Sequence, residues 1–122
     1  MPGNARQQKR IHQEACLSEK QYVVYLSPER KDRFRYYHRL ESGKIVRFSI
    51  QYEALFGKEW RPIARYDTAH GQPHRDLLHP DGSQEKRIFR GYSLNEVLIL
   101  GERDIKANWR QYRASYEKEM KS

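Results

Sequence analysis

Residues 33–56 read RFRYYHRLESGKIVRFSIQYEALF, and this stretch decides the fold. Apolar and polar side chains alternate through 33–40 and again through 45–56, which is the period of a strand with one buried face. The segment Glu41-Ser42-Gly43-Lys44 between them predicts a turn, so the two strands form an antiparallel hairpin. The side chains expected on the buried face are Phe34, Tyr36, His38, Leu40, Val46, Phe48, Ile50, Tyr52, Ala54 and Phe56.

The neighbouring sequence extends this hairpin into a sheet. Residues 21–26 (QYVVYL) are typical of a strand, and so are residues 86–90, with a loop expected over 68–85. After a turn at 57–59, Trp60, Ala64 and Tyr66 are expected to continue the apolar face, with Arg61 and Arg65 opposite. Pro62 indicates an edge or an irregularity in that strand.

A long helix follows the strands. Ser93 and Glu96 have the spacing of a capping box, which predicts a helix from about residue 93 to 118. Gly101 lies in the apolar stripe of this helix, where it would permit close packing on the sheet. The full stripe is Leu94, Val97, Leu98, Gly101, Ile105, Trp109, Tyr112 and Tyr116.

These patterns predict an α+β fold, an antiparallel β-meander of about four to five strands packed against a long C-terminal helix. A chain of 122 residues holds one hydrophobic core. We therefore expect one domain over residues 21–120, preceded by an arm over 1–20 in which a short helix at 7–16 is allowed.

Composition narrows the classes of partner. The chain carries 24 Lys and Arg against 16 Asp and Glu, a net charge of +8, which favours polyanions such as RNA. A single cysteine, Cys16, excludes an intrachain disulfide. The longest apolar runs are too short to span a bilayer, and residues 1–10 lack a signal-peptide core. We expect a cytoplasmic protein with no membrane partner.

Basic residues gather on the outward face of the predicted sheet. Residues 33–65 contain eight basic side chains and three acidic ones. Arginine pairs with phosphate in bidentate geometry, and Tyr37 lies among the arginines as a surface on which a base can stack. The alternative is a solvated face that keeps the protein soluble. The nucleic-acid-binding residues predicted here are Arg33, Arg35, Tyr37, Arg39, Arg47, Arg61 and Arg75.

Residues 65–79 (RYDTAHGQPHRDLLH) hold three of the five histidines. Imidazoles titrate near neutral pH, so His70 and His74 could exchange protons while an RNA 2′-OH attacks the adjacent phosphate. Arg65 would stabilise the phosphate and Asp67 would orient a histidine. The predicted catalytic set is Arg65, Asp67, His70, His74 and His79, with no metal or other cofactor.

Two alternatives remain open for this segment. Metal ligands could come from Asp67, His70, His74, Asp76 and His79, although no closed zinc pattern is present. The histidines could instead stabilise the loop by bonding aspartate side chains.

The order of motifs resembles a group of small prokaryotic proteins that are in turn similar to TumE-type toxins of toxin–antitoxin pairs. The resemblance lies in Arg65-Tyr66-Asp67-Thr68-Ala69-His70, a second histidine, the segment His79-Pro80-Asp81-Gly82 and the closing helix with DIKANWRQY at 104–112. The toxins have Asn in place of Thr68. The resemblance implies a sheet-plus-helix ribonuclease or RNA-binding fold of the RelE or barnase sort. It also implies a small helix-turn-helix antitoxin as partner, and functional roles for Arg65, Asp67, His70 and His74.

Three hypotheses therefore follow from the sequence. The first is a metal-independent endoribonuclease of toxin type. The second is a non-catalytic nucleic-acid-binding module that uses the cationic sheet face. The third is a protein-interaction subunit whose basic surface meets an acidic partner.

Overall fold

The computed structural model describes residues 17–122, apart from the side chain of His70. Six strands form one antiparallel sheet in the order of the sequence. The elements are β1 Leu17–Tyr25, β2 Asp32–Glu41, β3 Lys44–Phe56, β4 Glu59–Asp67, the 3₁₀ turn η1 Ala69–Gly71, β5 His74–Leu78, β6 Gln84–Ile88 and α2 Leu94–Met120. The α+β meander with one long C-terminal helix is confirmed, with six strands in place of four or five.

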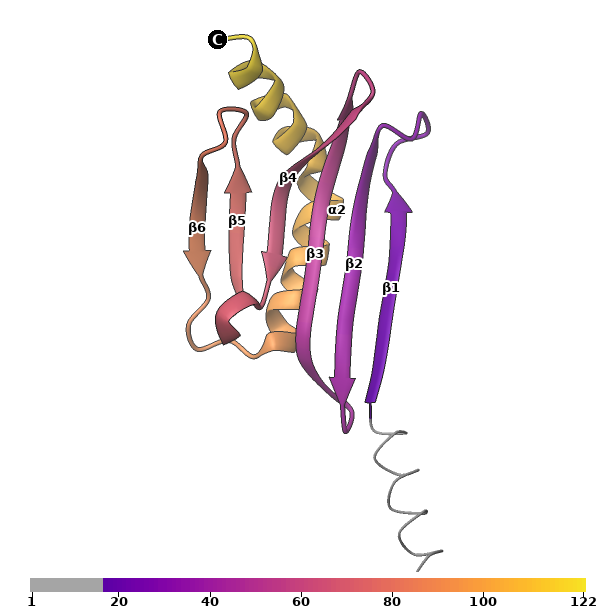
Figure 1. Ribbon diagram of the computed structural model, residues 1–122, viewed down its shortest axis with the longest axis vertical. Helices are drawn as coiled ribbons and strands as arrows, with labels where there is room; N and C mark the ends of the chain where they lie inside the picture. Colours follow the sequence, from indigo (N-terminus) through magenta and orange to yellow (C-terminus); the bar gives the residue numbers. More distant parts are fainter. Residues whose placement is uncertain (1–16) are drawn as a thin grey trace, which may run out of the picture.

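Helix α2 lies across one face of the sheet, against β3 and β4 (Figure 1). We call this side the helix face and the other side the open face, since no element within residues 17–122 covers it. The predicted helix stripe is confirmed, because Val97, Leu98, Gly101, Ile105, Trp109 and Tyr116 are buried. Ser93 and Glu96 form the capping box, with the Glu96 amide donating to Ser93 Oγ at 3.1 Å.

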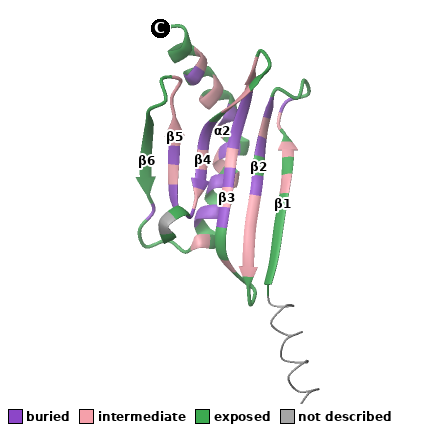
Figure 2. Cartoon of the chain, in the orientation of Figure 1, coloured by how far each residue is buried: buried purple, intermediate pink, exposed green. Residues whose placement is uncertain are grey.

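The core lies between α2 and the central strands (Figure 2). Phe34, Ile50 and Tyr52 from β2 and β3 are fully buried, and each such side chain stabilises the fold by about 1.5–3 kcal/mol. Strands β1 and β6 form the two edges of the sheet and are mostly exposed. The expected arm and the short helix at 7–16 lie outside the described residues, except that 17–20 are the start of β1.

Two β-bulges overturn part of the predicted facing. Val46 has no partner where Arg39 pairs with Arg47 and Leu40 with Ile45. Val46 is therefore exposed, in place of the buried position that strict alternation assigned to it. Ile63 has no partner where Tyr52 pairs with Ala64 and Glu53 with Pro62, so side chains before it change face.

The second bulge changes the environments of Trp60 and Arg61. Trp60 lies on the open face, under the guanidinium of Arg33, and does not continue the apolar side. Arg61 lies on the helix face, where the Tyr116 hydroxyl of α2, followed by Glu59, raises the pKa of its guanidinium. Both predicted facings were wrong because the extra residue resets the alternation.

Candidate functional site

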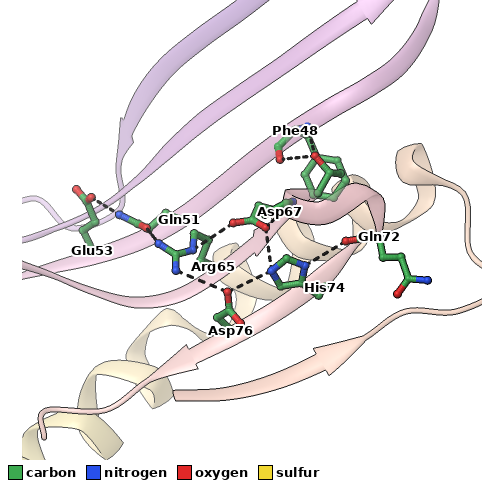
Figure 3. Close-up of polar contacts among 10 residues, drawn as sticks. Phe48, Gln51, Glu53, Arg65, Asp67, Gln72, His74 and Asp76 are labelled. Atoms are coloured by element: carbon green, nitrogen blue, oxygen red, sulfur yellow. Dashed lines mark hydrogen bonds and ion pairs between the residues drawn. The ribbon is translucent and has the colours of Figure 1, made fainter. Parts of the chain in front are cut away.

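The segment expected as a loop after residue 68 contains β5, and this strand builds a cluster with β4. Arg65 is paired in register with Asp76, and Asp67 with His74. Because paired residues of neighbouring strands point to the same side, all four side chains meet on the open face (Figure 3). We call them the Arg65–Asp67–His74–Asp76 cluster.

His74 is the centre of the cluster and is 5 % exposed. Its Nε2 lies 2.9 Å from Asp67 Oδ1 and 3.3 Å from Asp76 Oδ2. Its Nδ1 lies 3.1 Å from the carbonyl oxygen of Gln72, which only accepts hydrogen bonds. Both ring nitrogens therefore face hydrogen-bond acceptors.

Arg65 links the two carboxylates. Its Nε lies 3.3 Å from Asp67 Oδ2, and one terminal nitrogen lies 3.6 Å from Asp76 Oδ2. The Ala69 amide also donates to Asp67 Oδ1, at 3.0 Å. The Asp67 carboxylate is thus held by a guanidinium, an imidazole and a backbone amide.

The polar chain continues across the sheet to β2. Arg65 donates to Gln51 at 3.1 Å, and Gln51 donates to Glu53 at 2.6 Å. Arg33 and Arg35 donate to the same carboxylate at 2.7 and 3.0 Å. Burial alone would raise the pKa of Glu53, but the hydrogen bonds from Arg33, Gln51 and Arg35 outweigh it and lower the pKa. Sequence reasoning missed this role of Gln51, although alternation places it on the correct face.

The predicted nucleic-acid-binding set divides into three groups. Arg33 is held between Glu53 and the Trp60 ring, with the guanidinium 3.7 Å from the ring centre, and its side chain is only 13 % exposed. Arg61 and Arg75 lie on the helix face. The open face retains Arg35, Tyr37, Arg39 and Arg47, which are neighbours on β2 and β3.

The predicted catalytic set also divides. Arg65, Asp67 and His74 meet, whereas His79 lies beyond the other end of β5. There its two ring nitrogens contact Glu119 and Glu85, at 2.8 and 2.7 Å. The prediction that joined His79 to the other histidines is therefore wrong, because β5 is an extended strand and not a loop. His70 lies in η1, and its side chain is outside what the structure describes.

A hollow of about 480 Å³ adjoins the cluster on the open face. Asp67 lies at its border, and the residues on both sides of His70 also line it. Thr68 fixes this border, because its Oγ1 accepts from the Phe48 amide at 3.1 Å. The lining residues are Tyr37, Val46, Arg47, Phe48, Ser49, Asp67, Thr68, Ala69 and Gly71.

Two like charges face each other beside this hollow. Arg39 and Arg47 are directly opposite in register on β2 and β3. Arg39 lies 3.5 Å from Glu41, and Arg47 makes no ion pair within the described part of the chain. Tyr37 lies next to both, with its hydroxyl donating to Glu19 at 3.0 Å.

The cluster also offers metal-ligand atoms. One atom each from Asp67, His74 and Asp76 lies within 4.8 Å of the other two. The donor set suits a divalent cation, but the Arg65 guanidinium contacts both carboxylates and would compete with it. Of the other ligands considered from sequence, His79 is held elsewhere by its two glutamates.

The fold and this site define a small α+β protein with a six-stranded meander, one covering helix and a polar cluster on the open face. The chain belongs to the family described as "Domain of unknown function (DUF7718)", whose model matches residues 17–122. No curated protein and no solved structure matched the chain. Within residues 17–122, no helix is both long enough and apolar enough to cross a membrane.

Proposed function

We propose that this protein binds single-stranded RNA along the open face, with a phosphate held between Arg39 and Arg47. The opposed pair of arginines is the observation that supports this best. Like charges directly opposite in a sheet destabilise it by roughly 0.2–1 kcal/mol, and a bound phosphate would remove that cost. Arginine also matches phosphate in geometry.

The hollow beside this pair suits a nucleotide. Its volume of about 480 Å³ is in the range of small-ligand sites. Tyr37 offers an aromatic ring, and Ser49, its partner in register on β3, offers a hydroxyl. A base stacked on a tyrosine typically contributes about 1–3 kcal/mol without sequence preference.

A toxin-type endoribonuclease is the second candidate, and the position of Asp67 favours it. Asp67 borders the hollow and is bonded to His74, while Ala69 and Gly71 place the backbone of His70 at the same border. His70 would take the 2′-OH proton, and the Asp67–His74 pair would deliver a proton to the leaving 5′ oxygen. The resemblance to TumE-type toxins agrees with this chemistry and would make a small DNA-binding antitoxin the partner.

RNA binding is tested by fluorescence anisotropy of a labelled single strand over a range of salt. We expect Arg47→Gln to weaken binding about tenfold and to reduce the slope of log K against log salt by about 0.7, the loss of one phosphate contact. Lys58→Gln is the matched control, since Lys58 is exposed at the far β3–β4 turn. Equal affinity of Arg47→Gln and wild type would refute the proposal.

Cleavage is tested on a denaturing gel with the same RNA, with and without a chelator. If the protein is an endoribonuclease, His70→Ala and His74→Ala should abolish cleavage while RNA affinity stays within about twofold of wild type. If the wild type cleaves RNA under none of these conditions, the endoribonuclease is rejected and the non-catalytic binding module remains. Cleavage that the chelator removes would point to a cation held by Asp67, His74 and Asp76.

A further inference from the structure

A second, larger depression lies on the helix face, between α2 and the β5–β6 hairpin. Its volume is about 820 Å³. Arg75 and Arg87 line it from the sheet and are directly opposite each other in register, and Arg103 joins them from α2. We call this depression the arginine groove. It repeats, on the other side of the sheet, the opposition of like charges seen at Arg39 and Arg47.

The acidic residues that line the groove already accept hydrogen bonds from neighbouring groups. The Glu96 carboxylate accepts from the Ser93 amide at 3.0 Å in the capping box. Asp104 accepts from the hydroxyls of Tyr66, at 2.6 Å, and Tyr112, and from the amide of Asn108 at 2.8 Å.

The three arginines, by contrast, have no carboxylate of the described chain within ion-pair distance. Burial would lower the pKa of Arg75, but the Tyr112 and Tyr66 hydroxyls and the Asp104 carboxylate outweigh it and raise that pKa. The Nε atom of Arg75 is also buried without a hydrogen-bond partner. A buried guanidinium N–H without an acceptor is costly, so Arg75 would be stabilised by an acceptor toward which its side chain can reorient.

Three exposed apolar side chains lie beside these charges on the wall formed by α2 and the residues before it. Tyr92, Ile99 and Leu100 are 50, 43 and 38 % exposed and line the groove beside the arginines. Single exposed apolar residues are normal on a protein surface, but here three adjoin unpaired cations in one depression. This combination fits a ligand that is both acidic and apolar.

We infer that the arginine groove is a docking site for an acidic, amphipathic segment of a partner protein. Carboxylates of the partner would lie between Arg75, Arg87 and Arg103, where planar guanidinium groups bind them in bidentate fashion. Apolar side chains of the same segment would cover Ile99 and Leu100. These aliphatic side chains favour a polypeptide over a nucleic acid, whose strands bind through phosphate contacts and aromatic stacking.

The inference does not depend on RNA binding, because the groove and the open face are opposite sides of the sheet. Strand β5 nevertheless belongs to both. Its Arg75 faces the groove, whereas His74 and Asp76 face the cluster. A partner bound in the groove would therefore contact β5, the strand that supplies His74 and Asp76 to the cluster.

The full chain can be titrated with a 14-residue synthetic peptide of alternating Glu and Leu, at low salt. Side-chain NMR signals of Tyr92, Ile99 and Leu100 report whether it occupies the groove. We expect binding at least about tenfold tighter than for the same peptide with Lys in place of Glu, or with Gly in place of Leu. No binding of the Glu–Leu peptide, or equal binding of all three, would overturn the inference.

A pair of double variants separates the two surfaces. Arg87→Gln with Arg103→Gln should weaken peptide binding about tenfold or more, whereas Arg39→Gln with Arg47→Gln removes the same charge from the open face and should leave it within about twofold. Equal losses in both would reduce the effect to net charge and overturn the inference. The inference would also be overturned if the groove variant bound RNA more weakly than wild type while the open-face variant did not.

Discussion

Glu53 is the residue at which two open-face arginines of β2, Arg33 and Arg35, converge. Its carboxylate is 9 % exposed and accepts from Arg33, Arg35 and Gln51. This acidic residue therefore holds together part of an otherwise basic face. The consequence is that Arg33 stabilises the sheet and Arg35 is only partly available, so the proposed phosphate binding depends on Arg39 and Arg47.

Glu53→Gln should destabilise the fold by about 2 kcal/mol, because two guanidinium groups lose their charged acceptor. The folded-state pKa of Glu53 is lowered, so its contribution is present above the unfolded pKa and is lost as pH falls through the folded value. Urea unfolding from pH 7 to pH 3 measures this. The wild type should lose more stability than Glu53→Gln over that range. Parallel curves would contradict the assignment.

Arg47→Gln should change the stability of the fold and its affinity for RNA in opposite directions. Removing one of two opposed arginines relieves repulsion, so the free energy of unfolding should rise by about 0.2–1 kcal/mol while RNA affinity falls. Thermal unfolding without RNA gives the first quantity and anisotropy the second. A variant that loses stability as well as affinity would show that Arg47 has a structural role instead.

At the scale of elements, regular alternation predicted the faces of β2 and most of β3, and the helix stripe, because each has one buried side. Alternation failed for Val46, which is itself a bulge residue, and for Trp60 and Arg61, which precede the bulge at Ile63. No residue type marks these bulges unambiguously, although Pro62 indicated an irregularity next to the second one.

Strand β5 was predicted as a loop, since His74, Arg75 and Asp76 lack the apolar residues that mark a strand. On one face its polar side chains pair with β4, as Asp67 contacts His74 and Arg65 contacts Asp76. Such pairing depends on register between strands, which a single sequence does not display. The cluster residues were therefore largely predicted, while their arrangement was not.

Gly101→Ala tests the contact between α2 and the sheet. A Cβ at Gly101 would lie 2.7 Å from the buried ring of Tyr66, which cannot move without disturbing the core. Overpacking typically costs about 1–3 kcal/mol, more than the roughly 1 kcal/mol that alanine gains in helix propensity. Chemical denaturation should show net destabilisation. Ala107→Gly, at an exposed helix position, is the comparison that isolates propensity.

At the scale of the whole molecule, His79 joins the β5–β6 hairpin to the end of α2. Hydrogen bonds with Glu119 and Glu85 raise the pKa of His79. A raised folded pKa gives a contribution that is fully present below the unfolded value of about 6.5 and is lost as pH rises through the folded value.

Hydrogen-exchange protection factors of the hairpin should therefore fall as pH rises from 6 to 8, relative to those of β2 and β3. In His79→Gln this pH dependence should vanish, and an NMR titration of the wild type should place the His79 midpoint above 6.5. A hairpin whose relative protection is the same in both proteins at every pH would contradict the role of His79.

The order of elements also has a consequence for synthesis. All six strands precede α2 in the chain, and the buried side of β2 and β3 has no other cover within residues 17–122. A ribosome adding about 5–20 residues per second needs about 1–5 s for the 27 residues of α2. During that time the nascent sheet exposes an aromatic surface. A chaperone that binds such surfaces could therefore bind the sheet before α2 packs on it.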